Sequence, residues 1–153
     1  MRAIGLDVGT KTIGVAGSDP LGMLAHPLTT VARRGLRVDI PEILAIARAR
    51  EARIAVIGLP LELEGDEKRS ARLARQVGAA LAAQSDLEVL FVDERFTSVQ
   101  AERQLIAAGA SRKRRKAVID QAAAVLILQA WIDHGAAVVH NHSATTQGGQ
   151  DGA

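Results

Sequence analysis

The chain has 153 residues, 48% of them hydrophobic, and a formal net charge of +2 at pH 7, which fits one domain with a substantial core. It contains no cysteine, which excludes disulfides, thiolate metal sites and cysteine nucleophiles. No apolar run approaches the roughly 18 residues that span a bilayer, and the N-terminus lacks the pattern of a secretory signal, so we expect a cytoplasmic protein.

The first part of the chain predicts three strands joined by short turns. Residues 2–8 are mostly apolar and residues 12–18 alternate in polarity, with turn-forming residues 9–11 between them. Residues 23–31 predict a third strand. Pro27 within that strand favours an edge of the sheet, because proline cannot donate a hydrogen bond to a neighbouring strand. We therefore expect an antiparallel meander.

After the meander, helical periods alternate with short apolar strands. The predicted elements are helix 37–51, strand 54–59, helix 67–83, strand 89–92, helix 97–109 and a final helix over about 117–133. The two strands are continuously apolar, which is typical of strands covered on both faces. We expect a little structure at most over residues 136–139 and a disordered tail over residues 140–153, where the composition turns small and polar.

The element order β-β-β-α-β-α-β-α-α predicts an α/β domain over residues 1–139. Its sheet should be mixed and five-stranded, with the three-strand antiparallel meander joined to two parallel strands and helices on both faces. This is the layout of the ribonuclease-H-like fold, in which the first strand lies at the centre.

Acidic residues at strand ends are the first candidates for a functional site. Asp7 lies at the end of the first strand, and Asp93 and Glu94 follow the last one. Sites in open α/β sheets form at the carboxyl ends of the parallel strands, so these acids should share one edge. Because adjacent residues of a strand point to opposite faces, only one of Asp93 and Glu94 can face the same site as Asp7. We favour Glu94 as the ligand and give Asp93 a supporting role.

Asp120 is a further candidate, in the predicted first turn of the final helix. The helix dipole favours an acid in a first turn, which gives Asp120 an ordinary structural explanation. The basic residues just before it oppose that dipole, so a role in the site is the competing interpretation.

Three carboxylates would suit the cleavage of phosphodiester bonds. That reaction needs an activated water and a stabilised leaving oxygen, and two Mg²⁺ ions about 3.5–4 Å apart supply both. Mg²⁺ takes oxygen ligands and keeps several waters, so a few carboxylates can hold it. We expect Mg²⁺, with Mn²⁺ as the alternative, and no histidine metal site, since His26 and His134 are isolated in the sequence.

One unbroken basic run precedes the final predicted helix. It consists of Arg112, Lys113, Arg114, Arg115 and Lys116. Such runs contact phosphates, although a solvated loop explains the charge equally well. The chain has only 2% aromatic residues, which argues against a platform for base stacking. If the protein binds nucleic acid, we expect it to hold mainly the backbone.

An ordered set of short segments resembles one known family. The segments are Asp7-Val8-Gly9-Thr10-Lys11, Gly14-Val15-Ala16, Gly58-Leu59-Pro60, Asp93-Glu94-Arg95-Phe96-Thr97-Ser98, the basic run, and Asp120-Gln121-Ala122-Ala123-Ala124 with Ile127-Leu128-Gln129. Together they resemble the YqgF/RuvX family of Holliday junction resolvases and pre-16S rRNA nucleases, over roughly residues 1–135. Each motif alone is weak, whereas the ordered set is highly specific.

The resemblance implies a ribonuclease-H-like fold and a cytoplasmic, Mg²⁺-dependent nuclease that matures the 5′ end of small-subunit rRNA. It supports Asp7, Glu94 and Asp120 as catalytic metal ligands, with Asp93, Lys11 and Arg95 in supporting roles. One loop departs from the family pattern: an Asn-Met-Asp-Gly-like segment is replaced by Glu-Leu-Glu-Gly at residues 62–65. We therefore carry over no substrate contact at Glu62, and leave Glu62 or Glu64 as an auxiliary ligand as the less favoured alternative.

Other functions remain open at the level of sequence. A Holliday junction resolvase cuts two strands symmetrically and should be a two-fold dimer. No dimer helix is obvious, so we favour precursor rRNA over branched DNA and leave monomer or homodimer open. A phosphotransferase of the actin or sugar-kinase type also opens with a strand and an Asp-x-Gly-Thr turn, but it binds nucleotide between two such domains, in about twice this length. A binding module without catalysis is the remaining alternative.

Overall fold

The computed structural model describes residues 2–61, 69–97, 99, 112–135 and 138–139, without the side chains of residues 96, 112–120 and 138–139. The elements in chain order are β1 (Ala3–Val8), β2 (Thr12–Ser18), β3 (Ala25–Ala32), α1 (Leu36–Ala49), β4 (Ile54–Leu59), α2 (Arg69–Gln84), β5 (Glu88–Asp93), the 3-10 helix η1 (Glu94–Phe96), α4 (Arg112–His134) and β6 (Val138–Val139). No helix in these described ranges combines the length and the apolar composition that crossing a bilayer requires.

The strands form one mixed sheet in the order β3-β2-β1-β4-β5-β6. β1 pairs antiparallel with β2 and parallel with β4, β3 continues the meander, and β5 pairs parallel with β4. The predicted fold class is confirmed, including the inner place of the first strand and the edge strand that contains Pro27. The two-residue β6 adds a sixth strand antiparallel to β5, where the sequence predicted little structure.

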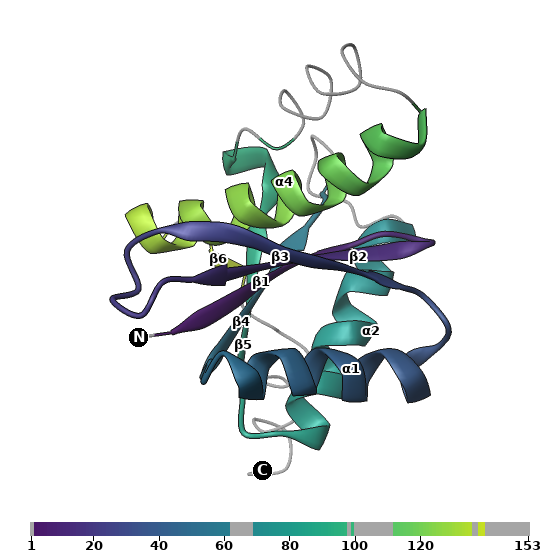
Figure 1. Cartoon of the computed structure of the whole chain (residues 1–153), viewed down its shortest axis with the longest axis horizontal. Helices are drawn as coiled ribbons and strands as arrows, with labels where there is room; N and C mark the ends of the chain where they lie inside the picture. The colour runs from purple at the N-terminus through teal and green to yellow at the C-terminus, as the bar shows by residue number, and fades with distance from the viewer. Residues whose placement is uncertain (1, 62–68, 98, 100–111, 136–137, 140–153) are drawn as a thin grey trace, which may run out of the picture.

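Helices cover both faces of the sheet, with α1 and α2 on one side and α4 on the other (Figure 1). The even-numbered residues of β1 belong to the core beneath α1 and α2, whereas Ala3 belongs to the core beneath α4. Gly5 also faces α4, since a Cβ there would lie 2.7 Å from the Cβ of Leu128. By the alternation of strand residues, Asp7 lies on the α4 face as well.

The final helix begins earlier than predicted. α4 starts at Arg112, so the basic run forms its first turns and is not a loop before it. Arginine and lysine have high helix propensity, and like charges one turn apart cost only about 0.2–0.5 kcal/mol, so the charge does not prevent a helix. Asp120 therefore lies about two turns inside α4 and not in its first turn. The helix dipole, which acts within the first turn, does not explain this acid.

Three predicted segments lie largely or wholly outside the described residues. They are the helix over 97–109, the tail over 140–153, and the loop that contains Glu62 and Glu64. At the start of the first segment, Thr97 Oγ1 accepts a hydrogen bond from the N–H of Val99 at 3.3 Å, as an N-cap threonine does.

Candidate active site

Asp7 and Glu94 lie at the same end and on the same face of the sheet. Asp7, near the end of β1, is 7% exposed, and Glu94, directly after β5, is 2% exposed. Extending the β1–β4 register by one pair beyond Leu6 and Ile57 puts Gly58 beside Asp7. A Cβ on Gly58 would lie 2.9 Å from Oε1 of Glu94. The Glu94 carboxylate therefore lies over β4, about one strand spacing (~4.8 Å) from β1.

Gly58 makes room for this arrangement. Besides meeting Glu94, its Cβ would lie 2.4 Å from Cδ1 of Ile127 in α4, which is closer than packed carbon atoms approach. A side chain at this position would have to displace Ile127, the Glu94 carboxylate or both. The first glycine of the Gly-Leu-Pro segment thus has a packing role directly beneath one of the predicted site residues.

Asp93 is bound to its own neighbour. Its side chain accepts a hydrogen bond from the N–H of Arg95 at 2.9 Å, as the cap of η1, and forms an ion pair with Arg95 Nη2 at 2.6 Å. Hydrogen bonding to Asp93 raises the pKa of Arg95, which keeps the guanidinium charged. Asp93 is therefore bound to Arg95, whereas Glu94 lies over Gly58, on the same face of the sheet as Asp7.

Two glutamines of α4 fix its direction across the sheet. Gln121 Nε2 donates to Oγ1 of Thr30, near the end of β3, at 2.9 Å. Gln129 Oε1 accepts from the N–H of Ala25, at the start of β3, at 2.7 Å. α4 is therefore antiparallel to β3. Since β1 and β3 are both antiparallel to β2, α4 is antiparallel to β1 too.

The same hydrogen bonds place Gln121 of α4 beside the strand residues of the predicted site. Thr30 pairs with Gly14, and Gly14 pairs with Asp7, so these residues form one row across the meander. Gln121, bonded to Thr30, lies at this row, and Asp120 precedes it by one residue in the helix. The side chain of Asp120 lies outside the described residues, as do those of the basic run over 112–116, so their roles stay predictions.

Arg33, which forms an ion pair with the buried Asp39, is hydrogen-bonded to the turn that follows Asp7. Arg33 Nη1 donates to the carbonyl oxygen of Gly9 at 3.0 Å, and the backbone N–H of Arg33 donates to the carbonyl oxygen of Lys11 at 2.9 Å. Arg33 Nε lies 3.8 Å from Oδ2 of Asp39, which is fully buried. Sequence reasoning assigned no role to Arg33 or Asp39. The available signal was an arginine directly after a strand, followed by an acid in the first turn of the next helix.

The donor set fits a divalent cation. Carboxylate oxygens are the ligands Mg²⁺ takes, and two like charges at the ends of nearby strands repel unless a cation offsets them. Among the described side chains, no three of His, Cys, Asp and Glu gather closely enough to hold a metal, and Asp120 is not in that set. Asp7 and Glu94 are therefore two of the predicted ligands, and any further ligand would come from outside these side chains.

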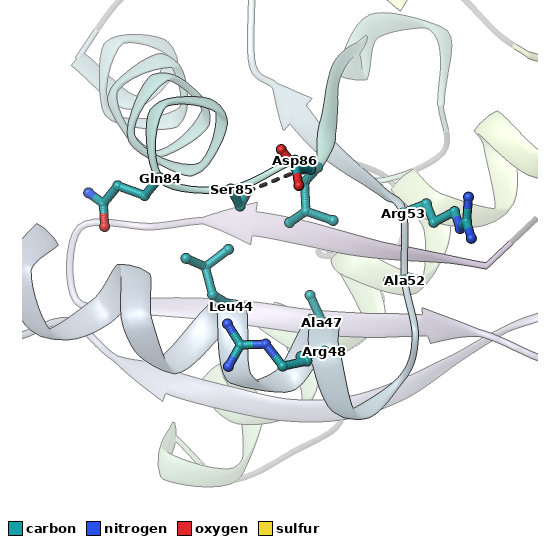
Figure 2. Close-up of a pocket in the computed structure, with 9 residues that line it drawn as sticks. Leu44, Ala47, Arg48, Ala52, Arg53, Gln84, Ser85 and Asp86 are labelled. Atoms are coloured by element: carbon teal, nitrogen blue, oxygen red, sulfur yellow. Dashed lines mark hydrogen bonds between the residues drawn. The ribbon is translucent and has the colours of Figure 1, made fainter.

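A cleft of about 610 Å³ lies at the opposite end of the sheet, between the end of α1 and the segments before β4 and β5 (Figure 2). In Figure 2, Leu44 of α1 points toward the turn that carries Ser85 and Asp86. Arg48 and Arg53 also line this cleft, whereas Asp7, Glu94 and the other predicted site residues do not. With one carboxylate and two arginines, its lining does not supply the acidic ligands that Mg²⁺ requires.

Comparison with known proteins gives the same family as the motifs. The family described as "RuvX: Holliday junction resolvase" matches residues 1–134. A protein of Myxococcus xanthus is 46% identical over 133 residues, covering 87% of this chain and 88% of its own. One of Moorella thermoacetica is 47% identical over 133 residues, covering 87% and 95%. Both carry the name "Putative pre-16S rRNA nuclease".

Solved structures agree on the fold. T. thermophilus RuvC, solved in complex with a Holliday junction substrate, has a TM-score of 0.57 at 12% identity, covering 90% of this chain and 98% of its own. The predicted fold class is confirmed by this likeness, and the prediction of a nuclease agrees with the family. The chain belongs to the RuvX family.

Proposed function

We propose that this chain is a cytoplasmic, metal-dependent endonuclease that processes the 5′ end of precursor 16S rRNA. The observation that carries the proposal is that two buried carboxylates, Asp7 and Glu94, lie on one face at the carboxyl end of the parallel strands, with Glu94 over Gly58 of the strand next to Asp7. Sites in open α/β sheets form at that end. The names of the relatives supply the substrate.

In this proposal Asp7 and Glu94 hold Mg²⁺, or Mn²⁺, and Asp120 supplies a third carboxylate. The bound cation would supply an activated water and stabilise the leaving oxygen. Arg95 holds Asp93 and fixes the end of β5, so that Glu94 keeps its position. Each of these residues thus either holds the cation or orients a residue that does.

The position of α4 supports Asp120 as the third ligand. Ala124 O lies 2.9 Å from the Cβ position of Gly5, so helix and strand touch at this point. Asp120 precedes Ala124 by four residues, which is about 6 Å along the helix axis. Asp7 follows Gly5 by two residues, which is about 6.6 Å along the strand. Because α4 is antiparallel to β1, the two steps lead in the same direction, from that contact to Asp120 and to Asp7.

Substrate binding is assigned to positive charge. The basic run over residues 112–116 forms the first turns of α4. This is the end of the helix nearer to Gln121, which lies at the row of Asp7. Arginine and lysine contacts to phosphates do not depend on sequence, which suits a chain with 2% aromatic residues. Lys11, in the turn after Asp7, would contact further substrate phosphates on the side away from the basic run.

Cleavage of a four-way DNA junction is the second candidate function. The description of the family favours it, and it shares the chemistry and the proposed ligands. It differs in symmetry, because paired cuts require a two-fold dimer. The oligomeric state of the purified protein, alone and with each substrate, therefore separates the two functions.

The test uses wild-type protein and the Asp7→Asn variant with a labelled 5′ precursor fragment of 16S rRNA and a labelled four-way DNA junction. We expect the wild type to cleave the RNA with Mg²⁺ or Mn²⁺ and not with EDTA. Asp7→Asn should lose more than about a hundredfold in rate, because it removes a metal ligand. Its melting temperature should match that of the wild type, which excludes unfolding.

Two outcomes would contradict the proposal in different ways. Retained cleavage by Asp7→Asn would remove Asp7 from the site. Cleavage of the junction alone, by a dimeric wild-type protein, would replace RNA processing with the second candidate function.

A further inference from the structure

Three exposed cations lie at the sheet end at which β1 terminates, on the side of the β1–β2–β3 meander. Lys11 lies in the β1–β2 turn, Arg34 directly after β3, and Arg37 in the first turn of α1. These segments lie side by side, because the N–H of Arg33 donates to the carbonyl oxygen of Lys11 at 2.9 Å. Lys11 follows Asp7 by four residues, so the two backbones are at most about 14 Å apart. We call Lys11, Arg34 and Arg37 the site rim.

Among the described residues, no acid is paired with a cation of the site rim. Asp39, the acid in the first turn of α1, is fully buried and is bound to Arg33 and to the backbone N–H of Arg34. Within the described part of the chain, the side chains of Lys11, Arg34 and Arg37 make no hydrogen bond or ion pair. The site rim therefore presents its positive charge to solvent.

The stability of α1 does not explain the placement of Arg37. Arg37 lies at the positive end of the α1 dipole, where a cation is disfavoured and an acid is favoured. The buried carboxylates Asp7 and Glu94 at the same end of the sheet would repel a polyanion. Exposed cations nearby reduce that repulsion for an incoming phosphate chain.

We propose that the site rim binds phosphates of the substrate RNA beside the cleaved bond, on the side of the sheet end away from α4. The inference rests on the proposed function and adds to it a second contact surface besides the basic run over residues 112–116. The RNA backbone would pass between the two positive surfaces, across the carboxylates. Exposed cations that contact phosphates make binding strongly dependent on salt.

The other end of α1 supplies a matched control. Arg48 and Arg53 are also exposed, and they flank the C-terminal end of this helix as Arg34 and Arg37 flank its start. They share their cleft with Asp86, at the sheet end away from Asp7 (Figure 2). Neutralising either pair of arginines changes the net charge by the same amount.

The experiment compares Arg34→Gln/Arg37→Gln with Arg48→Gln/Arg53→Gln in binding the labelled 5′ precursor fragment of 16S rRNA. Binding is measured by fluorescence anisotropy in EDTA over a series of salt concentrations. Each lost contact to a single strand should flatten the slope of log K against log salt by about 0.7, which is about fivefold in Kd at 0.1 M salt. We expect about a 25-fold loss for the site-rim variant and less than about twofold for the control.

Thermal melting and a single variant extend the test. The site-rim variant should melt at or above the temperature of the wild type, because it relieves charge at the positive end of the helix dipole. Lys11→Gln alone should weaken binding about fivefold at 0.1 M salt. A lowered melting temperature with unchanged binding would show that the arginines serve the fold and would overturn the proposal.

Equal weakening by the two double variants would also overturn it, because net charge alone would then explain the effect. Since binding is measured without metal, the result is independent of cleavage. If the wild type does not cleave but the two double variants still differ in RNA binding, only the proposed function is contradicted. If the wild type cleaves normally but the two double variants bind RNA equally well, only the role of the site rim is contradicted.

Discussion

The two ends of the sheet contain similar charged residues and use them differently. Where β1, β4 and β5 begin, opposite charges lie together: Arg2 is paired with Glu51, and Asp86 shares its cleft with arginines. Where these strands end, ion pairs also occur, between Arg33 and Asp39 and between Asp93 and Arg95. In addition, Asp7 and Glu94 are buried there on one face, and Lys11, Arg34 and Arg37 are exposed. Ion pairs support the fold, whereas buried carboxylates and exposed cations are what a metal ion and a phosphate chain require.

The strongest test of this difference uses two glutamates at opposite ends of one strand. Glu94 follows β5 and is buried, whereas Glu88 begins β5 and is exposed. Glu94→Gln should lower Mg²⁺-dependent cleavage by more than about a hundredfold, since an amide is a poor replacement for a ligating carboxylate. Glu88→Gln should leave the rate unchanged. Single-turnover cleavage assays on both variants measure the effect.

Melting curves provide the control for this pair, because neither substitution should lower the melting temperature by more than a few degrees. Equal rates for the two glutamate variants would mean that the ends of β5 do not differ in function. That outcome would remove Glu94 from the site.

The next effect is smaller and comes from packing. Gly58→Ala places a Cβ against Ile127 and Glu94, which should destabilise the fold by about 1–3 kcal/mol and shift the carboxylate. A misplacement of about 1 Å can lower a rate about a hundredfold. We expect a loss of about ten- to a hundredfold in cleavage. Denaturant unfolding and cleavage rates are both measured at a temperature where the variant is folded.

Gly78→Ala is the matched change on the opposite face of the sheet. A Cβ there would lie 2.5 Å from Cζ of Phe91, so overpacking should destabilise this variant too. Its cleavage rate should stay normal, because Gly78 faces the core beneath α1 and α2. If both variants lost activity in proportion to stability, Gly58 would have no special relation to Glu94.

Much of the sheet could be predicted, because local pattern and tertiary environment agree there. β4 has the predicted bounds of 54–59, since a continuously apolar run is buried on both faces. The alternation of strand residues predicts different directions for Asp93 and Glu94, and in the structure Asp93 contacts Arg95 while Glu94 lies over Gly58.

Two features could not be predicted, for different reasons. The first turns of α4 contain consecutive basic residues, which have helix propensity but no apolar period, so the predicted start near 117 was too late. The brace between Arg33, Asp39 and the turn at Gly9 depends on bringing the end of β3 beside the end of β1. Nothing in the local sequence specifies that contact.

The two glutamines of α4 provide a third comparison. Gln121→Ala removes the hydrogen bond to Thr30 of β3, and Gln129→Ala removes the hydrogen bonds to the backbone of Ala25 and Met23. Each hydrogen bond contributes about 0.5–1.5 kcal/mol to stability. Only Gln121 lies at the row of Asp7, so we expect roughly a tenfold slower cleavage for Gln121→Ala and a normal rate for Gln129→Ala. Thr30→Ser keeps the hydroxyl that Gln121 contacts and should keep the rate, whereas Thr30→Val should match Gln121→Ala. Slow cleavage by Gln129→Ala would show that helix stability, and not register at the site, sets the rate.

The smallest effect belongs to the loop between β2 and β3, at the sheet end away from Asp7. The N–H of Met23, 2.7 Å from Oδ1, lowers the pKa of Asp19 below its ordinary value. A carboxyl whose pKa is lower in the folded state stabilises the fold fully above its unfolded pKa, about 3.9, and loses this contribution as pH falls through the folded pKa. Wild type should therefore melt above Asp19→Asn from pH 5 to 7, and the difference should shrink as the pH falls below about 4, with cleavage at pH 7 unchanged. A difference that grew with acid, or a slower cleavage rate, would contradict the assignment of this loop to the fold alone.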